Sequence, residues 1–147
     1  MAEEQQQPTS EELVTQFIED VWSQGNLEAA DEIVAEEYVE HDPALPEPIH
    51  GREAFKENVA GFREALAGLE KDIEEIIVDD DSVAVHYTFT GTHEAELWGT
   101  EPTGQEVTQE GVFFFEIDDT QITEATHLWN AYGLLQEIDA IPESPGW

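Results

Sequence analysis

The segment VAVHYTFT (residues 83–90) alternates between two kinds of side chain along its whole length. Apolar and aromatic residues occupy the odd positions, and small or polar residues occupy the even ones. This period of two predicts a strand with one buried face. Residues 73–78, 107–117 and 122–129 show similar strand character and are separated by acidic turns or a glycine-rich loop. The second half of the chain is therefore expected to form an antiparallel meander.

The first half of the chain has a helical period instead. Thr9 and Glu12 form a capping-box pattern ahead of an apolar stripe in residues 13–22. The third predicted helix opens at Gly51, and its stripe comprises Phe55, Val59, Phe62, Leu66 and Leu69. Helices followed by a meander indicate an α+β fold. We expect a cone-shaped, curved antiparallel sheet wrapped around helices, with one apolar pocket where the helices do not fill the sheet.

The charge of the chain limits its partners. Its 147 residues suit one domain, expected at 9–139 between tails at 1–8 and 140–147. Against 36 Asp and Glu there are only 4 Lys and Arg, which gives a net charge of −32. So few cations exclude a nucleic-acid face, and an anionic membrane would repel the protein. Molar salt screens such a surface, which favours a cytoplasmic protein of an extreme halophile.

Other classes of protein are excluded by what the sequence lacks. Without cysteine there is no disulfide, thiolate nucleophile or cysteine-bound zinc. No apolar run approaches 18 residues, and the polar, acidic N-terminus does not fit a secretory signal. The five histidines form neither a His-x-His pair nor an HExxH motif, so no metal site is expected.

Four segments, taken in order, carry a resemblance that covers nearly the whole chain. They are FIEDVWSQGNLEAADEIVAEEYVEHDP (17–43), GREAFKENVAGFREAL (51–66), VAVHYTFTGTHEAELWGTEPTGQEVT (83–108) and GVFFFEIDDTQITEATHLWNAYGLLQ (111–136). With these segments the chain resembles the SnoaL-like polyketide cyclases of the nuclear transport factor 2-like superfamily. The resemblance implies aldol-type ring closure without a metal or an organic cofactor. The place of the family's catalytic acid falls on His127, and that of its polar assistant on Phe113.

His127 is the first candidate for proton transfer. Strand alternation places it on one face with Ala125 and Trp129, which we take as the pocket face. A neutral imidazole is a capable general base near neutral pH. The alternative is a core histidine bonded to a backbone carbonyl or to Tyr87. His93 and His41 are the candidates for a donor that polarises a carbonyl group.

Two further sets of residues concern the ligand. An apolar cavity is expected to be lined by aromatic residues, with these candidates: Phe62, Tyr87, Phe89, Trp98, Phe113 and Trp129. The four cations, Arg52, Lys56, Arg63 and Lys71, fall on or just after the third predicted helix. Ion pairing with neighbouring acids is favoured over capture of an anionic ligand by Arg52.

Two function hypotheses follow. The first is cofactor-free acid–base chemistry on a small hydrophobic carbonyl compound, an isomerisation or an aldol-type cyclisation. The second is a non-catalytic module of the same fold that binds such a molecule. Epoxide hydrolysis, as in the similar limonene-epoxide-hydrolase branch, would need an Asp–Arg–Asp cluster on inward positions, and neither arginine lies on a predicted strand. A homodimer is expected through the outer sheet face, where Val112, Phe114 and Leu128 lie.

Overall fold

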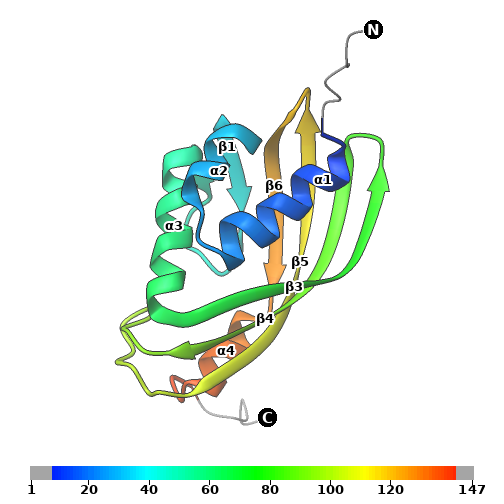
Figure 1. Ribbon diagram of the computed structural model, residues 1–147. Coiled ribbons are helices and arrows are strands. Elements are labelled where there is room, and N and C mark those ends of the chain that lie inside the picture. Colours follow the sequence, from blue (N-terminus) through cyan, green and yellow to red (C-terminus); the bar gives the residue numbers. More distant parts are fainter. Residues whose placement is uncertain (1–7, 142–147) are drawn as a thin grey trace, which may run out of the picture.

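The computed structural model describes residues 8–141 as a curved sheet with helices packed against one face (Figure 1). The predicted α+β fold is confirmed. The tails expected at 1–8 and 140–147 lie almost wholly outside the described residues, so the proposed domain bounds stay a prediction. None of the helices within 8–141 has the length and apolar character needed to cross a membrane.

The sheet has six strands in the spatial order β2-β1-β6-β5-β4-β3. The strands are β1 (Val34–His41), β2 (Ile49–His50), β3 (Leu66–Asp79), β4 (Ser82–His93), β5 (Glu106–Asp118) and β6 (Gln121–Trp129). β3 to β6 form the expected meander, whereas β1 pairs with β6 in parallel. This pairing places Glu40 opposite Ala125. The end of β1 therefore lies beside the end of the last strand.

The helices are α1 (Ser10–Gln16), the π-helix η1 (Phe17–Ser23), α2 (Leu27–Ile33), α3 (Arg52–Ala65) and α4 (Ala131–Glu137). The predicted capping box is confirmed, because Thr9 Oγ1 accepts from the Glu12 amide and Glu12 accepts from the Thr9 amide. α1 and η1 run across the concave face of the sheet (Figure 1). Phe17, one of their buried side chains, packs edge-on against the rings of Phe113 and Phe115.

The third helix ends earlier than the sequence pattern predicts. α3 stops at Ala65, and Leu66 already pairs with His93 as the first residue of β3. Leu66 and Leu69 are buried as expected, but as strand residues on either side of Gly68, whose φ is +69°. A shift of register between Ala67 and Glu70 accompanies this bend. Lys71 is consequently an inward-facing residue of a strand.

Candidate active site

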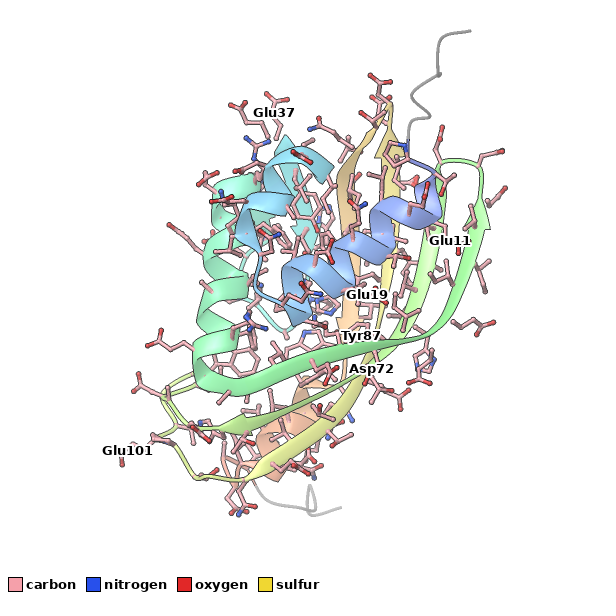
Figure 2. The ribbon with its side chains drawn as sticks, in the orientation of Figure 1. Glu11, Glu19, Glu37, Asp72, Tyr87 and Glu101 are labelled. Atoms are coloured by element: carbon pink, nitrogen blue, oxygen red, sulfur yellow. The ribbon has the colours of Figure 1, made fainter. Side chains whose placement is uncertain are left out.

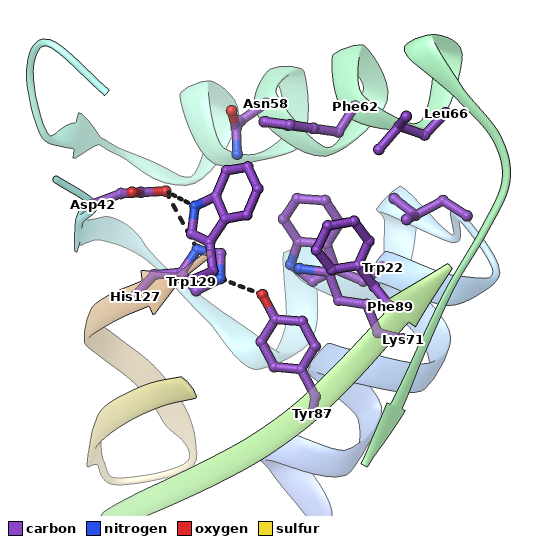
Figure 3. Close-up of a pocket in the computed structure, with 11 residues that line it drawn as sticks. Trp22, Asp42, Asn58, Phe62, Leu66, Lys71, Tyr87, Phe89, His127 and Trp129 are labelled. Atoms are coloured by element: carbon purple, nitrogen blue, oxygen red, sulfur yellow. Dashed lines mark hydrogen bonds and ion pairs between the residues drawn. The ribbon is translucent and has the colours of Figure 1, made fainter. Parts of the chain in front are cut away.

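A pocket opens between α3 and the concave face of the sheet (Figure 3). The space among its lining side chains, counted together with its open mouth, is about 330 Å³. Five aromatic side chains form much of its wall: Trp22, Phe62, Tyr87, Phe89 and Trp129. Its polar groups are Asp42, Asn58, Lys71 and His127. The pocket therefore suits a small, mainly apolar molecule with one or two polar atoms.

His127 borders this pocket from β6, as the strand alternation predicts. The residue is only 5% exposed, and its ring stacks on Phe113 with 3.8 Å between centroids and 6° between planes. Nε2 lies 2.5 Å from the hydroxyl oxygen of Tyr87. Both features weighed from the sequence are thus present, because His127 borders the pocket and is also bonded to Tyr87.

Two buried carboxylates lie behind the imidazole. Nδ1 of His127 is 3.4 Å from Asp42 Oδ2 and 3.5 Å from Glu40 Oε2. Each carboxylate is oriented by a ring donor: the Trp129 indole donates to Asp42 over 3.0 Å, and the Tyr38 hydroxyl donates to Glu40 over 2.7 Å. Figure 3 shows the chain from Asp42 through His127 to Tyr87, where it ends at the pocket, and Glu40 also faces Nδ1 of His127.

The environment fixes where protons reside along this chain. Burial alone would raise the pKa of Asp42, but His127, the Ala44 amide and the Trp129 indole together hold that pKa below its ordinary value. Burial, reinforced by the charges of Glu40 and Asp42, raises the pKa of Tyr87 well above its ordinary range. Asp42 is therefore an anion and Tyr87 a phenol. With the Tyr87 hydroxyl assigned as the donor, Nε2 of His127 accepts this hydrogen bond and Nδ1 faces the carboxylates.

The same three side chains form a group able to hold a metal ion. Glu40, Asp42 and His127 each offer a ligand atom, and these atoms all lie within 4.8 Å of one another. His127 Nδ1 and Glu40 Oε2 are buried without a hydrogen bond. One imidazole and two carboxylates are ligands that a divalent cation accepts. The expectation of a metal-free site thus stays a prediction, which chelation can test.

Lys71 is a pocket residue that sequence reasoning did not select. It lies on β3 with 5% exposure, and its Nζ is 3.5 Å above the centroid of the Trp22 ring. Burial lowers the pKa of Lys71 to about 7, although the charges of Glu40 and Asp42 oppose the shift. The signal was present in the sequence, because Leu69 and Lys71 share a parity once this segment is assigned to a strand.

The other two predicted histidines lie away from His127. His93 is fully buried, and its Nδ1 lies 3.0 Å from the hydroxyl of Thr103, where it also accepts from the Thr103 amide. It holds the loop that follows β4. His41 is exposed on the sheet and pairs with Glu124 over 2.8 Å. Strand alternation explains why His41 is exposed: it lies between the buried Glu40 and Asp42, so its side chain points to the opposite face of the sheet.

The aromatic candidates divide into three groups. Phe62, Tyr87, Phe89 and Trp129 border the pocket. Phe113 is fully buried beneath the His127 ring and supports it from below. Trp98 is 42% exposed, and its ring centroid lies 5.7 Å from that of Phe62 and 5.8 Å from that of Trp129. It therefore packs on the outside of two pocket walls.

The remaining cations have structural partners. Arg52 and Lys56 both pair with Asp31, so the ion pairing favoured from the sequence is present for these two residues. The guanidinium of Arg63 donates to the backbone carbonyls of Trp22, Ser23 and Leu69. Arg63 thus joins η1 to the start of β3. Neither arginine borders the pocket around His127.

Comparisons with known proteins agree with this architecture. Residues 12–138 match the family described as SnoaL-like polyketide cyclase. A crystal structure of a candidate polyketide cyclase from Acidithiobacillus ferrooxidans has 29% identity and a TM-score of 0.79, over 89% of this chain and 94% of that one. A candidate SnoaL-like polyketide cyclase from Jannaschia sp. CCS1 has 22% identity and a TM-score of 0.83, over 97% and 99% of the two chains.

A third solved structure carries a different description. AclR, a candidate hydroxylase from Streptomyces galilaeus, has 22% identity and a TM-score of 0.80, over 93% of this chain and 85% of that one. No curated protein matches the sequence at a significant level. The family match spans both helices and sheet and includes every residue of the pocket. The chain belongs to the SnoaL-like polyketide cyclase family.

Proposed function

We propose that this protein enolises a small hydrophobic carbonyl compound by acid–base chemistry and so promotes its isomerisation or aldol-type cyclisation. The observation that carries the proposal is the buried chain of Asp42, His127 and Tyr87 ending in a mostly aromatic pocket. Proton transfer next to a carbonyl group needs a base and a donor for the developing oxyanion. The pocket supplies both with two adjacent side chains.

His127 is the proposed base, and Tyr87 is the proposed donor in place of His93 or His41. A carbonyl oxygen that enters the pocket takes over the hydrogen bond of the Tyr87 hydroxyl, which releases Nε2 of His127. Nε2 then accepts a proton from the carbon next to the carbonyl group, and the enolate oxygen stays bonded to Tyr87. Asp42 and Glu40 stabilise the imidazolium that forms, because both carboxylates face Nδ1.

Deuterium exchange into a simple methyl ketone tests this role without knowledge of the natural substrate. We suggest acetophenone in D₂O with about 1 M potassium chloride, where the Debye length is about 3 Å. The protein is expected to accelerate loss of the methyl proton signal above the buffer rate. Replacement of His127 by Gln removes the base and should lower this acceleration by about 10²-fold.

A surface histidine provides the matched control. His86 lies on the outer face of β4, where it pairs with Glu110. His86→Gln should therefore exchange at the wild-type rate. Wild-type exchange in the folded His127→Gln variant would contradict the proposed base. A ketone that binds to the wild-type protein but returns without deuterium would favour the second candidate function, a non-catalytic binding module.

A homodimer through the outer sheet face forms a second part of the proposal. Phe114 and Leu128 are 49% and 45% exposed on neighbouring strands, and Ile77 is exposed on β3. Ile77, Ala84 and Phe114 lie in one row across three strands. A monomer rarely exposes so continuous an apolar row. Sedimentation in molar salt is expected to give the dimer mass, and Phe114→Lys should shift it to the monomer.

We also propose that the protein works in the salt-rich cytoplasm of a halophile. Figure 2 shows Glu11, Glu19, Glu37 and Glu101 projecting from the surface on different elements. With a net charge of −32, these carboxylates repel one another in dilute buffer. The melting temperature should therefore rise steeply between about 0.1 M and 1 M potassium chloride. A melting temperature independent of salt would contradict this adaptation.

A further inference from the structure

Lys71 differs from the other three cations of the chain. Arg52, Lys56 and Arg63 all have carboxylate or carbonyl partners close to their charged groups. Within residues 8–141, the Lys71 side chain has no ion pair and no hydrogen bond, and the bond of Lys71 to Ser23 comes from its backbone amide. A lysine buried only for stability would be expected to have such a partner.

Aromatic rings take the place of an acidic partner. Nζ lies 3.5 Å from the Trp22 centroid, 4.6 Å from that of Tyr87 and 5.1 Å from that of Phe113. The titratable groups that face it are Tyr87 and, acting over a longer range, Glu40 and Asp42. Burial dominates these charges and holds the pKa of Lys71 at about 7. The uncharged, nucleophilic amine is then a substantial part of the population at neutral pH.

We propose that Lys71 is a nucleophile that captures a small hydrophobic aldehyde or ketone as an imine inside this pocket. The proposal rests on the proposed function, because the same class of carbonyl compound would occupy the same cavity. A carbonyl carbon above Lys71 places its oxygen toward Tyr87, since the amine lies over the ring whose hydroxyl meets His127. Lysine amines activated by desolvation form such adducts.

The covalent step balances with groups in the pocket. The lone pair of Nζ attacks the carbonyl carbon, and the π electrons of the C=O bond move to oxygen. That oxygen receives a proton from the Tyr87 and His127 pair, and Nζ gives one of its own protons back to the pair, which yields a neutral carbinolamine. The pair then donates this proton to the carbinolamine oxygen, which leaves as water while the nitrogen lone pair forms the C=N bond. The protonated imine that results becomes neutral when it returns its proton to the pair.

An imine with Lys71 would make the acid–base chemistry of the site more effective. A protonated C=N bond withdraws electrons more strongly than a C=O bond, so the adjacent C–H bond loses its proton more readily. The nearby proton acceptor is then His127, as in the proposed function. Lys71 would activate the substrate, and His127 would move the proton.

Reductive trapping tests the nucleophile directly. We suggest benzaldehyde with sodium cyanoborohydride at about pH 7 and about 1 M potassium chloride, conditions that screen the surface charge. Each trapped imine replaces one amine hydrogen with a benzyl group, which mass spectrometry of peptides locates. The chain has only two lysines, Lys56 and Lys71, so Lys56 is an internal control. Lys71 should be labelled at least about tenfold faster, because Lys56 is protonated and paired with Asp31.

Two variants and one comparison complete the test. Lys71→Met should remove the pocket label, whereas Lys56→Met should leave it at the wild-type rate. Equal or slower labelling of Lys71 relative to Lys56 in the wild-type protein would overturn the inference, even if Lys71→Met did not fold. Labelling at Lys71 without ketone exchange would defeat the proposed function alone, and exchange without labelling would defeat this inference alone.

Discussion

The acids of this protein occupy two regions with opposite properties. On the surface, carboxylates such as Glu11, Glu37 and Glu101 extend into solvent from helices, strands and loops (Figure 2). Beside the pocket, Glu40 and Asp42 are 0% and 8% exposed, and each accepts a hydrogen bond from a ring donor. The surface set is numerous and interchangeable, whereas the buried pair has a fixed geometry around one imidazole.

This difference shows how to find chemistry in a very acidic sequence. Exposed carboxylates are stabilised by water and salt, so their number describes the solvent rather than a site. A buried carboxylate loses that solvation and persists only with close partners. The acids that matter for function are therefore the few that are removed from water, and Lys71 follows the same rule among the cations.

The largest expected effect concerns the pH dependence of stability. The pKa of Lys71 is about 7 in the folded protein, below the ordinary value that it regains on unfolding. Between these values the unfolded chain binds more protons, so the free energy of unfolding rises with pH. The rise from about pH 7 to 10 is at most about 4 kcal/mol. Lys71→Met should remove it, as denaturant titrations of both proteins at several pH values would show. Parallel pH curves would contradict a desolvated amine.

A matched pair of acid variants tests the two regions directly. Asp42→Ala strips partners from His127, Trp129 and the Ala44 amide, and should lower the free energy of unfolding by about 3 kcal/mol. Glu37→Ala removes an exposed carboxylate and should change it by less than about 0.5 kcal/mol. Thermal unfolding in molar salt measures both. Similar losses for the two variants would remove the distinction between the regions.

The smallest effect is expected for an ion pair on the surface. His41 pairs with Glu124 while both side chains remain about half exposed. His41→Gln should cost less than about 1 kcal/mol, because exposed pairs are weak. It should also leave ketone exchange unchanged, since His41 faces away from the pocket. A strong loss of ketone exchange in His41→Gln, measured in parallel with His127→Gln, would show that His41 takes part in the reaction.

Particular residues show how far the sequence predicts this site. The alternation of β4 and β6 places Tyr87, Phe89, His127 and Trp129 correctly on the pocket side. The same rule fails for Lys71, because Leu66 and Leu69 extend the helical period of α3 and conceal the start of β3. His93 is inward as predicted, yet it lies beyond the pocket and bonds to Thr103. Parity gives the face of a sheet, but it does not give the position along that face.

Local pattern was enough for the class of fold, the cap of α1, the inward parity of the strands and the acidic surface, because each depends on neighbouring residues in the chain. The partners of His127 were decided only in three dimensions. The parallel pairing of β1 with β6 brings Glu40 and Asp42 to Nδ1, and the bend at Gly68 turns Lys71 inward. The order of strands in a sheet joins distant segments, and no period within either segment records which neighbour it will meet.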